Sequence, residues 1–370
     1  MILNVRYVEL AKNYLRNSKE NKMGYFNTIS NELKEYFYIL SPEIPDFIYE
    51  YVEAPEMQRL KYIGIAPGTD HTKLCNNRMF YSRLEHSVGV SLIVWNFTKD
   101  KKQALSGLFH DIANPAFSHC IDFLHGDYET QESTEELTTT IIKNSEYIMS
   151  RLERDGILLE EVDDYKIYPI ADNNTPRLSA DRLEYTFSNG FSYKDIWEKG
   201  DIKKFYSNLE ILKNEDGIIE LGFKDINIAE EYIEKIKTLW IGWICHEDRF
   251  LMQVIADIIK LMAEKNLISE KDFYKYGERE ILDQAKNCGI ERIKNAVVNF
   301  ENMTEVYISD VPKEGRYNVK IAAKRRYINP LIATEGKVVR IADVSIKSKE
   351  NIEEYLKYDM SKYIYSNFEI

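Results

Sequence analysis

The sequence of 370 residues predicts a mainly helical protein that ends in a small mixed α/β subdomain. Apolar residues recur with a helical period from about residue 46 to 270, most clearly between Glu230 and Lys265. After residue 300 the pattern changes to short, β-branched, partly alternating stretches that are broken by Gly315 and Gly336. We find no internal repeat and no low-complexity linker. The change of period therefore separates a helical bundle from a C-terminal part that contains strands.

Three segments follow from this pattern. Residues 1–45 form an N-terminal helical segment, which ends at the sequence SPEIP. Residues 46–270 form the main helical domain, and residues 271–370 form the C-terminal mixed α/β subdomain. Proline and capping signals place helices within the main domain, since proline clashes with the preceding helical turn. The expected helices run from Ser82 to Phe97, through QALSGLFHDI as far as Asn114–Pro115, from about Phe117, from Gln131 to Ile148 and from Glu230 to Lys265.

The C-terminal subdomain is expected to contain two or three strands and a final helix. The strand candidates are VYISDV, YNVKIAA and KVVRIADVSI, and the helix runs through IEEYLKYDMSKYI. Lys320, Lys324, Arg325 and Arg326 make one of these stretches basic. We interpret this stretch as a solvated edge strand. The alternative, a regulatory nucleotide site between subunits, is implied only by the resemblance to a known family that is described below.

Composition restricts the class of protein. The formal net charge of -12 argues against broad electrostatic binding of nucleic acid, but it allows a local basic pocket for a small anion. The four cysteines lie far apart, as expected for reduced thiols of a cytoplasmic protein. No apolar run reaches the ~18 residues of a membrane span, and the sequence MILNVRYVELAKN is too polar for a signal peptide. We expect a cytoplasmic homo-oligomer without a membrane partner.

Histidine and aspartate residues on three expected helices suggest a metal site. His110 and Asp111 are adjacent at the end of one helix, and on their own they would be interpreted as a polar pair that faces water. His86 lies on the preceding helix, and Asp181 opens the helical sequence ADRLEY. Two imidazoles and two carboxylates form a mixed ligand set that suits manganese, iron or zinc, with nickel or magnesium as alternatives. The sequence therefore predicts one divalent transition metal ion.

The order of three motifs resembles a known enzyme superfamily. YSRLEHSVGV, LFHDIANPAFSH and SADRLEY, in that order, look like the HD-domain metal-dependent phosphohydrolases, and most like the deoxynucleoside triphosphate triphosphohydrolase branch. The upstream IPDFIYEYVEAPEMQRLKYIG and the downstream RRYINPLI and GKVVRIADVS are also similar to that branch. The resemblance covers roughly residues 40 to 350 and implies that residues 46–270 form an HD-domain helical bundle.

The resemblance also implies roles for individual residues. His86, His110, Asp111 and Asp181 match the metal ligands. Arg83 matches an arginine near the phosphates, Arg182 matches a phosphate-contacting basic residue, and Tyr185 matches a tyrosine beside the sugar or base. His119 with Asp122 matches a histidine and aspartate that protonate the leaving oxygen, and Glu132 matches a further catalytic acid.

Two positions depart from the pattern of the branch. Asn114 and Gln131 stand where the family has histidines, so we expect them to contact substrate without transferring protons. The favoured reaction is the conversion of a deoxynucleoside triphosphate to a deoxynucleoside and triphosphate. The departures leave two alternatives open: an HD-type nucleotidase or phosphatase for another nucleotide, and a metal-bearing regulatory or binding protein without turnover.

The other histidines are expected to play lesser roles. His125 lies in the turn-like sequence LHGDY, and His71 lies in GTDHTKLCNN, an apparent insertion that we expect to form a loop. His246 is followed by Glu247, Asp248 and Arg249. We expect this polar cluster to lie on a solvated helix face, or alternatively to face the substrate cavity.

Overall fold

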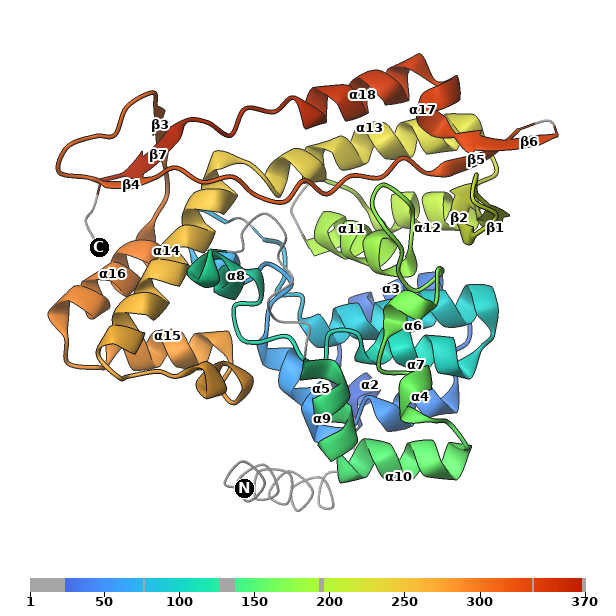
Figure 1. The fold of residues 1–370 in the computed structure, drawn as a ribbon, viewed down its shortest axis with the longest axis horizontal. Coiled ribbons are helices and arrows are strands. Elements are labelled where there is room, and N and C mark those ends of the chain that lie inside the picture. Colours follow the sequence, from blue (N-terminus) through green and yellow to red (C-terminus); the bar gives the residue numbers. More distant parts are fainter. Residues whose placement is uncertain (1–23, 76, 127–136, 193–195, 335, 368–370) are drawn as a thin grey trace.

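The computed structural model describes residues 24–75, 77–126, 137–192, 196–334 and 336–367, and it is mainly helical with two small sheets (Figure 1). The predicted fold class is therefore confirmed. The helices of the N-terminal half are α2 (Tyr25–Thr28), α3 (Asn31–Leu40), α4 (Asp46–Tyr51), α5 (Pro55–Gln58), α6 (Arg83–Thr98), α7 (Lys101–Phe109), α8 (His119–His125), α9 (Thr138–Asn144) and α10 (Glu146–Asp155).

The second half adds further helices and all of the named strands. Its helices are α11 (Ala180–Ser192), α12 (Lys199–Ser207), α13 (Ile226–Gly242), α14 (His246–Glu264), α15 (Glu278–Lys286), α16 (Glu291–Asn302), α17 (Ile341–Val344) and α18 (Ile346–Leu356). Its strands are β1 (Leu209–Lys213), β2 (Ile219–Phe223), β3 (Tyr307–Ser309), β4 (Tyr317–Val319), β5 (Leu331–Thr334), β6 (Lys337–Arg340) and β7 (Tyr363–Ser366).

Helix α6 lies at the centre of the bundle, in contact with α3, α7 and α11. It is apolar on several sides, so that Leu84, Val88 and Leu92 are all fully buried. A capping box between Ser82 and Glu85 fixes its first turn. The rigid start of α6 therefore lies inside the core, where it holds the side chains of its first turn in place.

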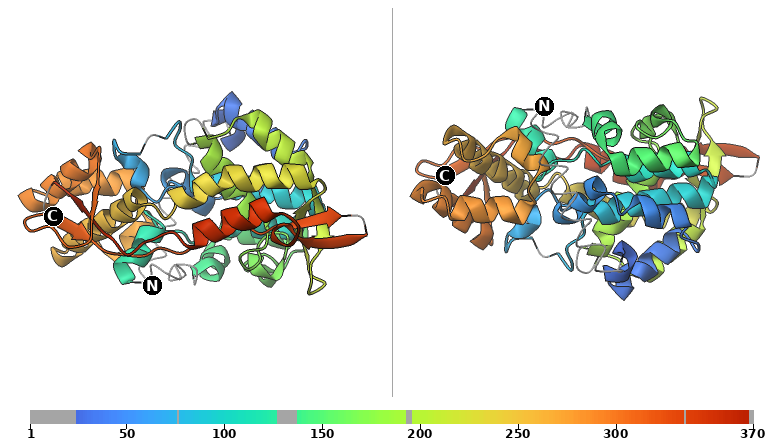
Figure 2. Two further views of the ribbon diagram at one scale, coloured as in Figure 1. Left: turned by 90° about the horizontal axis from the view of Figure 1, so that it is seen from above. Right: turned by 90° about the horizontal axis from the view of Figure 1, so that it is seen from below.

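The two sheets tie the C-terminal part to the rest of the chain. The order of one sheet is β1-β2-β5-β6, with β2 and β5 parallel and the other pairs antiparallel. The second sheet has the order β3-β7-β4 and is fully antiparallel. Between β4 and β5 the chain crosses the molecule in an extended conformation, while α18 packs along α13 (Figures 1 and 2). Residues beyond 320 thus contact helices of the main domain directly.

The predicted continuous helix from Glu230 to Lys265 is wrong, because the chain breaks between α13 and α14. Cys245 has an extended backbone, and its Sγ accepts a hydrogen bond from the amide of Asp248, which caps α14. The buried Arg249 guanidinium donates to the carbonyl of Ile244 at 2.9 Å and stabilises the bend. The apolar period continues across this break, so periodicity alone did not reveal it.

Other predicted elements also differ from the structure. In the described part of Gln131–Ile148, two helices meet at Ser145, whose hydroxyl caps α10. The final helix ends at Leu356, and the chain then forms β7, the central strand of its sheet. The β1–β2 hairpin was not predicted, and the basic stretch 320–326 is extended chain without strand pairing. Among the described residues, no helix is both long enough and apolar enough to cross a membrane.

Candidate metal centre and active site

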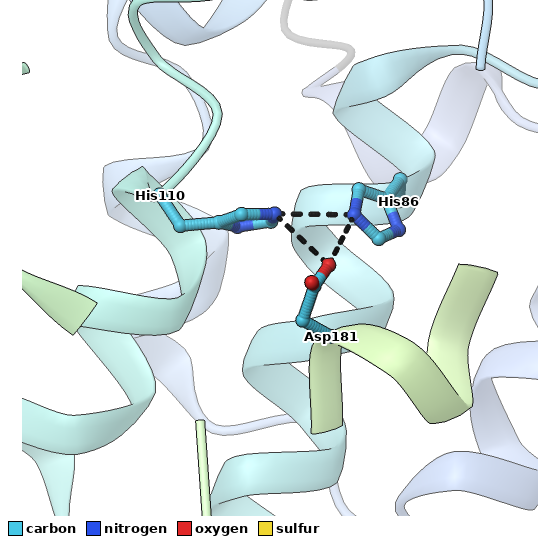
Figure 3. Close-up of side chains that lie close together, drawn as sticks. All are labelled: His86, His110 and Asp181. Atoms are coloured by element: carbon cyan, nitrogen blue, oxygen red, sulfur yellow. Dashed lines mark hydrogen bonds and ion pairs between the residues drawn. The ribbon is translucent and has the colours of Figure 1, made fainter. Parts of the chain in front are cut away.

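Three predicted metal ligands converge at the centre of the bundle (Figure 3). His86 comes from the first turn of α6, His110 caps the C-terminal end of α7, and Asp181 lies in the first turn of α11. The Nε2 atoms of the two histidines are 3.1 Å apart, and Oδ1 of Asp181 lies 3.1 Å from His86 Nε2 and 3.6 Å from His110 Nε2. These atoms all lie within 4.8 Å of one another, which fits a shared cation.

The other ring nitrogens explain why the Nε2 atoms point inwards. Nδ1 of His86 hydrogen-bonds the carboxylate of Glu184, and Nδ1 of His110 donates to the carbonyl of Gly107 at 2.7 Å. Because a carboxylate and a carbonyl only accept, each Nδ1 carries a hydrogen, and each neutral ring turns an Nε2 lone pair towards the other. Two facing lone pairs beside a carboxylate repel one another unless a cation lies between them. The donor set therefore fits a divalent metal ion.

The charges around His86 lead to the same conclusion. Burial lowers the pKa of His86, but Glu184, Asp181 and Asp111 together raise it to about 10. Burial raises the pKa of Asp181, but His110 and His86 hold it well below its ordinary value. The site thus strongly favours positive charge at Nε2, which a proton or a metal ion can supply.

Asp111 lies beside this group. Its carboxylate oxygens are 3.5 Å from His110 Nε2 and 3.8 Å from His86 Nε2. Arg83 donates to Oδ2 of Asp111 at 2.8 Å, and Asn114 donates to Oδ1. The structure therefore brings the fourth predicted ligand to the centre, where an arginine and an amide orient its carboxylate.

Glu184 orients the imidazole of His86. Its buried carboxylate accepts hydrogen bonds from Tyr36 at 2.9 Å and from Tyr81 at 2.7 Å, in addition to the contact with His86. Gly89 leaves room for this arrangement, because a Cβ at that position would lie 2.6 Å from Glu184. Sequence analysis missed Glu184, although it follows Asp181 by three residues and so lies on the same helix face.

The candidate metal ligands lie in the wall of a cavity of about 900 Å³. This volume is suitable for a nucleotide-sized ligand. His86, His110, Asp111 and Asp181 line it together with basic side chains from three distant parts of the chain. These basic residues are Arg83, Lys166, Arg177, Arg182, Lys324 and Arg326. Although the whole chain has a net charge of -12, its basic side chains gather next to the candidate metal site.

The cavity wall also contains Arg182 and an aromatic pair. The guanidinium of Arg182 lies 3.2 Å from Asp172 and hydrogen-bonds Asn173 and Ser179, so its orientation is fixed. Tyr185 packs edge-on against Trp243, with ring centroids 5.2 Å apart. Both rings line the cavity, where they offer an apolar surface to a sugar or base.

His119 also lines the cavity, at the start of α8. Its Nδ1 lies 3.0 Å from Oδ2 of Asp122, and its Nε2 lies 3.4 Å from a guanidinium nitrogen of Arg326. Burial lowers the pKa of His119 to about 4, and the charges of Arg326 and Arg83 contribute to this shift. The imidazole is therefore neutral near pH 7, with its Nδ1 hydrogen directed to Asp122.

Asp248 and Arg326 also line the cavity, and Asp248 thereby agrees with the alternative expectation for the polar cluster of α14. Burial raises the pKa of Asp248, on the first turn of α14, to about 7, although Arg326 and Arg249 oppose the shift. Arg326 belongs to the basic stretch that we interpreted as a solvated edge strand, an interpretation that the structure corrects. Only the long-range packing of the extended C-terminal segment brings it to His119. No local sequence signal reveals this contact.

The remaining candidates lie elsewhere. Gln131 and Glu132 lie outside the described residues. His125 is exposed near Glu270, with 3.7 Å between the two side chains. In the polar cluster of α14, His246 contacts Tyr358, whereas Asp248 lines the cavity.

Comparisons with known proteins find relatives that cover most of the chain. No known protein-family profile matches the chain. The chain is similar to the uncharacterised protein YdhJ of Bacillus subtilis, with 25% identity over 83% of this chain and 94% of that protein. It is also similar to the metal-dependent phosphohydrolase cns2 of Cordyceps militaris, with 21% identity over 78% of this chain and 81% of that protein.

Solved structures share the fold. A hypothetical protein of Aquifex aeolicus matches with a TM-score of 0.61 and 14% identity, covering 88% of this chain and 93% of that one. A phosphohydrolase of Bacteroides thetaiotaomicron matches with a TM-score of 0.58 and 16% identity, covering 87% and 96%. These matches show that the chain shares the fold of these two proteins over most of its length.

Proposed function

We propose that the protein is a metal-dependent phosphohydrolase that acts on a nucleotide. The favoured reaction converts a deoxynucleoside triphosphate to a deoxynucleoside and triphosphate. One observation carries the proposal: the convergent Nε2 atoms of His86 and His110 and the carboxylate of Asp181 face a cavity with several basic side chains. The name of the relative cns2 supports the same reaction class. The proposal also includes a cytoplasmic location and a homo-oligomeric assembly.

The metal centre consists of His86, His110, Asp111 and Asp181. A bound manganese, iron or zinc ion, with nickel or magnesium as alternatives, polarises the phosphoryl group and lowers the pKa of water. Arg83 keeps the Asp111 carboxylate ionised and oriented, since its guanidinium donates to Oδ2 at 2.8 Å. Burial raises the pKa of Asp111, but His110 and Arg83 lower it below its ordinary value.

The basic wall binds the phosphate chain. Arg83 and Arg326 lie on the His119 side of the cavity, and Arg182 is held on the Asp172 side. A single phosphate group does not need basic residues from so many directions, so the wall supports a polyphosphate substrate. Guanidinium groups suit this role because their planar forks match phosphate oxygens. Tyr185 and Trp243 then receive the sugar or base.

His119 protonates the leaving oxygen once the phosphates are bound. In the free protein Arg326 and Arg83 help to keep the imidazole neutral. A bound polyphosphate offsets these positive charges and raises the pKa of His119 towards the range of a general acid. Asp122 holds Nδ1 and thereby directs Nε2 into the cavity.

The replacement of two family histidines keeps another nucleotide substrate as the alternative. Asn114 donates its amide hydrogen to Asp111, so it supports the metal centre and cannot transfer protons. The loss of two histidines, at Asn114 and Gln131, favours a nucleoside monophosphate or a modified nucleotide as the substrate. The basic side chains of the cavity wall favour the longer phosphate chain. A metal-bearing regulatory protein without turnover is the third possibility.

A panel of nucleotides and metals tests the proposal. The protein is incubated with deoxynucleoside triphosphates, ribonucleoside triphosphates and monophosphates in the presence of manganese, iron, zinc, nickel or magnesium, and the products are separated by ion exchange. We expect deoxynucleoside and triphosphate. Inorganic phosphate as the only product supports the alternative substrate class, and no product with any pair contradicts catalysis. The His110→Ala, Asp111→Ala variant is the negative control.

A further inference from the structure

A second group of histidine and carboxylate side chains lies outside the cavity wall. Asp70 and His71 belong to the short 3-10 helix η2 (Thr69–His71), and Glu278 is the first residue of α15. One ligand atom of each lies within 4.8 Å of the others. Sequence analysis placed His71 in a loop, and the structure shows that its side chain is only 15% exposed and that of Glu278 1% exposed.

Several polar atoms of this group have no hydrogen-bond partner among the described residues. Oδ1 of Asp70 and Nε2 of His71 are both buried and unbonded. Nε2 of His71 lies 3.6 Å from Oε2 of Glu278, which is beyond normal hydrogen-bond distance. Buried polar atoms of this kind are rare and call for an explanation, such as a bound ion.

The charges of the group also favour a cation, because the carboxylates of Asp70 and Glu278 lie beside a single imidazole. The neighbouring Arg279 does not neutralise the carboxylates directly, because it pairs with Asp283 and Glu301. Buried carboxylates of this kind are normally paired or bound to a metal.

Glu278 links this group to the segment that carries His119. Its Oε2 accepts from the amide of Gly64 and its Oε1 from the amide of Phe117, each at 3.1 Å. Phe117 and Ser118 have positive φ angles of 65° and 38°, a backbone conformation that costs free energy for residues other than glycine. The contacts of Glu278 therefore help to hold a strained turn two residues before His119.

We propose that Asp70, His71 and Glu278 bind a second divalent metal ion, which stabilises the turn before His119. One imidazole nitrogen and two carboxylate oxygens form a ligand set that suits zinc, as well as manganese or iron, with water completing the coordination. The site is structural, because its ligands face a packed region between η2, α15 and the Phe117 turn. It is separate from the centre at His86, and its existence does not depend on the proposed reaction.

Metal stoichiometry tests this proposal. The whole protein is loaded with zinc, passed over a desalting column and measured by elemental analysis beside three variants. We expect two ions in the wild type and one in His110→Ala, Asp111→Ala. The variant Asp70→Asn, His71→Ala should also retain one, and His125→Ala, which changes an exposed histidine, should retain two. The proposal is overturned if the His110 and Asp111 variant retains no ion, or if the Asp70 and His71 variant binds as many ions as the wild type.

Thermal unfolding gives a second readout, whose first step leaves Asp70 and His71 unchanged. In the His110→Ala, Asp111→Ala background, zinc should still raise the Tm, because an ion that binds only the folded state stabilises it. The milder change Asp70→Asn in that background should remove most of the shift. A Tm that does not respond to zinc in the His110→Ala, Asp111→Ala protein contradicts the second site. Hydrolysis by the wild type would remain possible in that case.

Discussion

The two histidine–carboxylate groups of this protein differ in their surroundings more than in their ligands. The group at His86, His110 and Asp181 faces a cavity of about 900 Å³ with basic side chains on its wall. The group at Asp70, His71 and Glu278 is tied to backbone amides and lies away from that wall. Similar donor atoms therefore suit different roles. A group that faces a cavity with basic side chains is suited to catalysis, whereas a group that is enclosed and bonded to backbone amides is suited to stabilising the fold.

The largest effect that separates the two groups is expected from His110→Ala with Asp111→Ala. This double change removes an imidazole and a carboxylate from the cavity centre, so hydrolysis should fall to background. Asp70→Asn with His71→Ala should lower the Tm and leave measurable turnover. Activity assays and thermal unfolding of both proteins check the contrast. Equal loss of activity in the two variants would remove the distinction between a catalytic and a structural group.

His119→Ala should give the next largest effect. Loss of the leaving-group acid should reduce kcat by roughly 10²–10⁴-fold without changing the metal content. The reduction should shrink for a nitrophenyl phosphate ester, whose leaving group needs little protonation. His125→Ala serves as the matched control. A uniform reduction for good and poor leaving groups would argue that His119 only maintains the structure.

Arg83→Ala should reduce kcat/KM by about 10²-fold, because a charge-stabilising donor next to the phosphates is lost. Arg83→Lys should restore only part of the activity, since an ammonium group lacks the planar fork of guanidinium. Metal analysis must accompany the kinetics, because Arg83 also orients Asp111 at 2.8 Å. Full activity of Arg83→Lys would contradict a bidentate phosphate contact.

Glu184→Gln should weaken metal binding at the cavity centre by about 10–100-fold, the usual effect of losing a partner behind a ligating histidine. The amide keeps the size of the side chain but removes the negative charge that favours the Nδ1 hydrogen of His86. Titration with a metal-sensitive dye measures the affinity. Glu153→Gln, on the exposed face of α10, is the control. Unchanged affinity would assign Glu184 a packing role alone.

The smallest expected effect is a shift in the titration of His119. Its pKa of about 4 means that the imidazole of the free protein loses its charge well below pH 6.5. Inorganic triphosphate should raise that pKa, because its negative charge offsets Arg326 and Arg83. Proton NMR of the ring hydrogens as a function of pH measures both values. A free-protein pKa near 6.5 that triphosphate does not shift would contradict the charge coupling.

The helical fold and the start of α6 near Ser82 were predicted from residues that lie close together in the chain. His86, His110 and Asp181 lie far apart, and their convergence was predicted from three short motifs taken together. The break between α13 and α14 was missed because the apolar period runs through it. The β1–β2 hairpin was missed although Asp216–Gly217 is a typical hairpin turn signal.

The parts that were not predicted depend on distant segments. Arg326 reaches His119 across 207 positions of sequence separation, and Glu278 reaches Phe117 across 161. The contact of Arg326 forms because β5 pairs with β2 and draws the extended C-terminal segment across the cavity. Neither the hydrophobic period of the sequence nor a local motif encodes such a strand pairing. The basic stretch 320–326 was therefore interpreted as a solvated edge strand.

The source of the oxygen atom in the product tests the proposed reaction most directly. The protein is incubated with a deoxynucleoside triphosphate in water enriched in ¹⁸O, and the products are analysed by mass spectrometry. Attack of water on the α-phosphorus releases the deoxynucleoside and leaves one ¹⁸O atom in the triphosphate. The proposed reaction predicts this labelled triphosphate in the wild type and none in His110→Ala, Asp111→Ala. Label in inorganic phosphate or in the deoxynucleoside, or equal labelling by the variant, would contradict it.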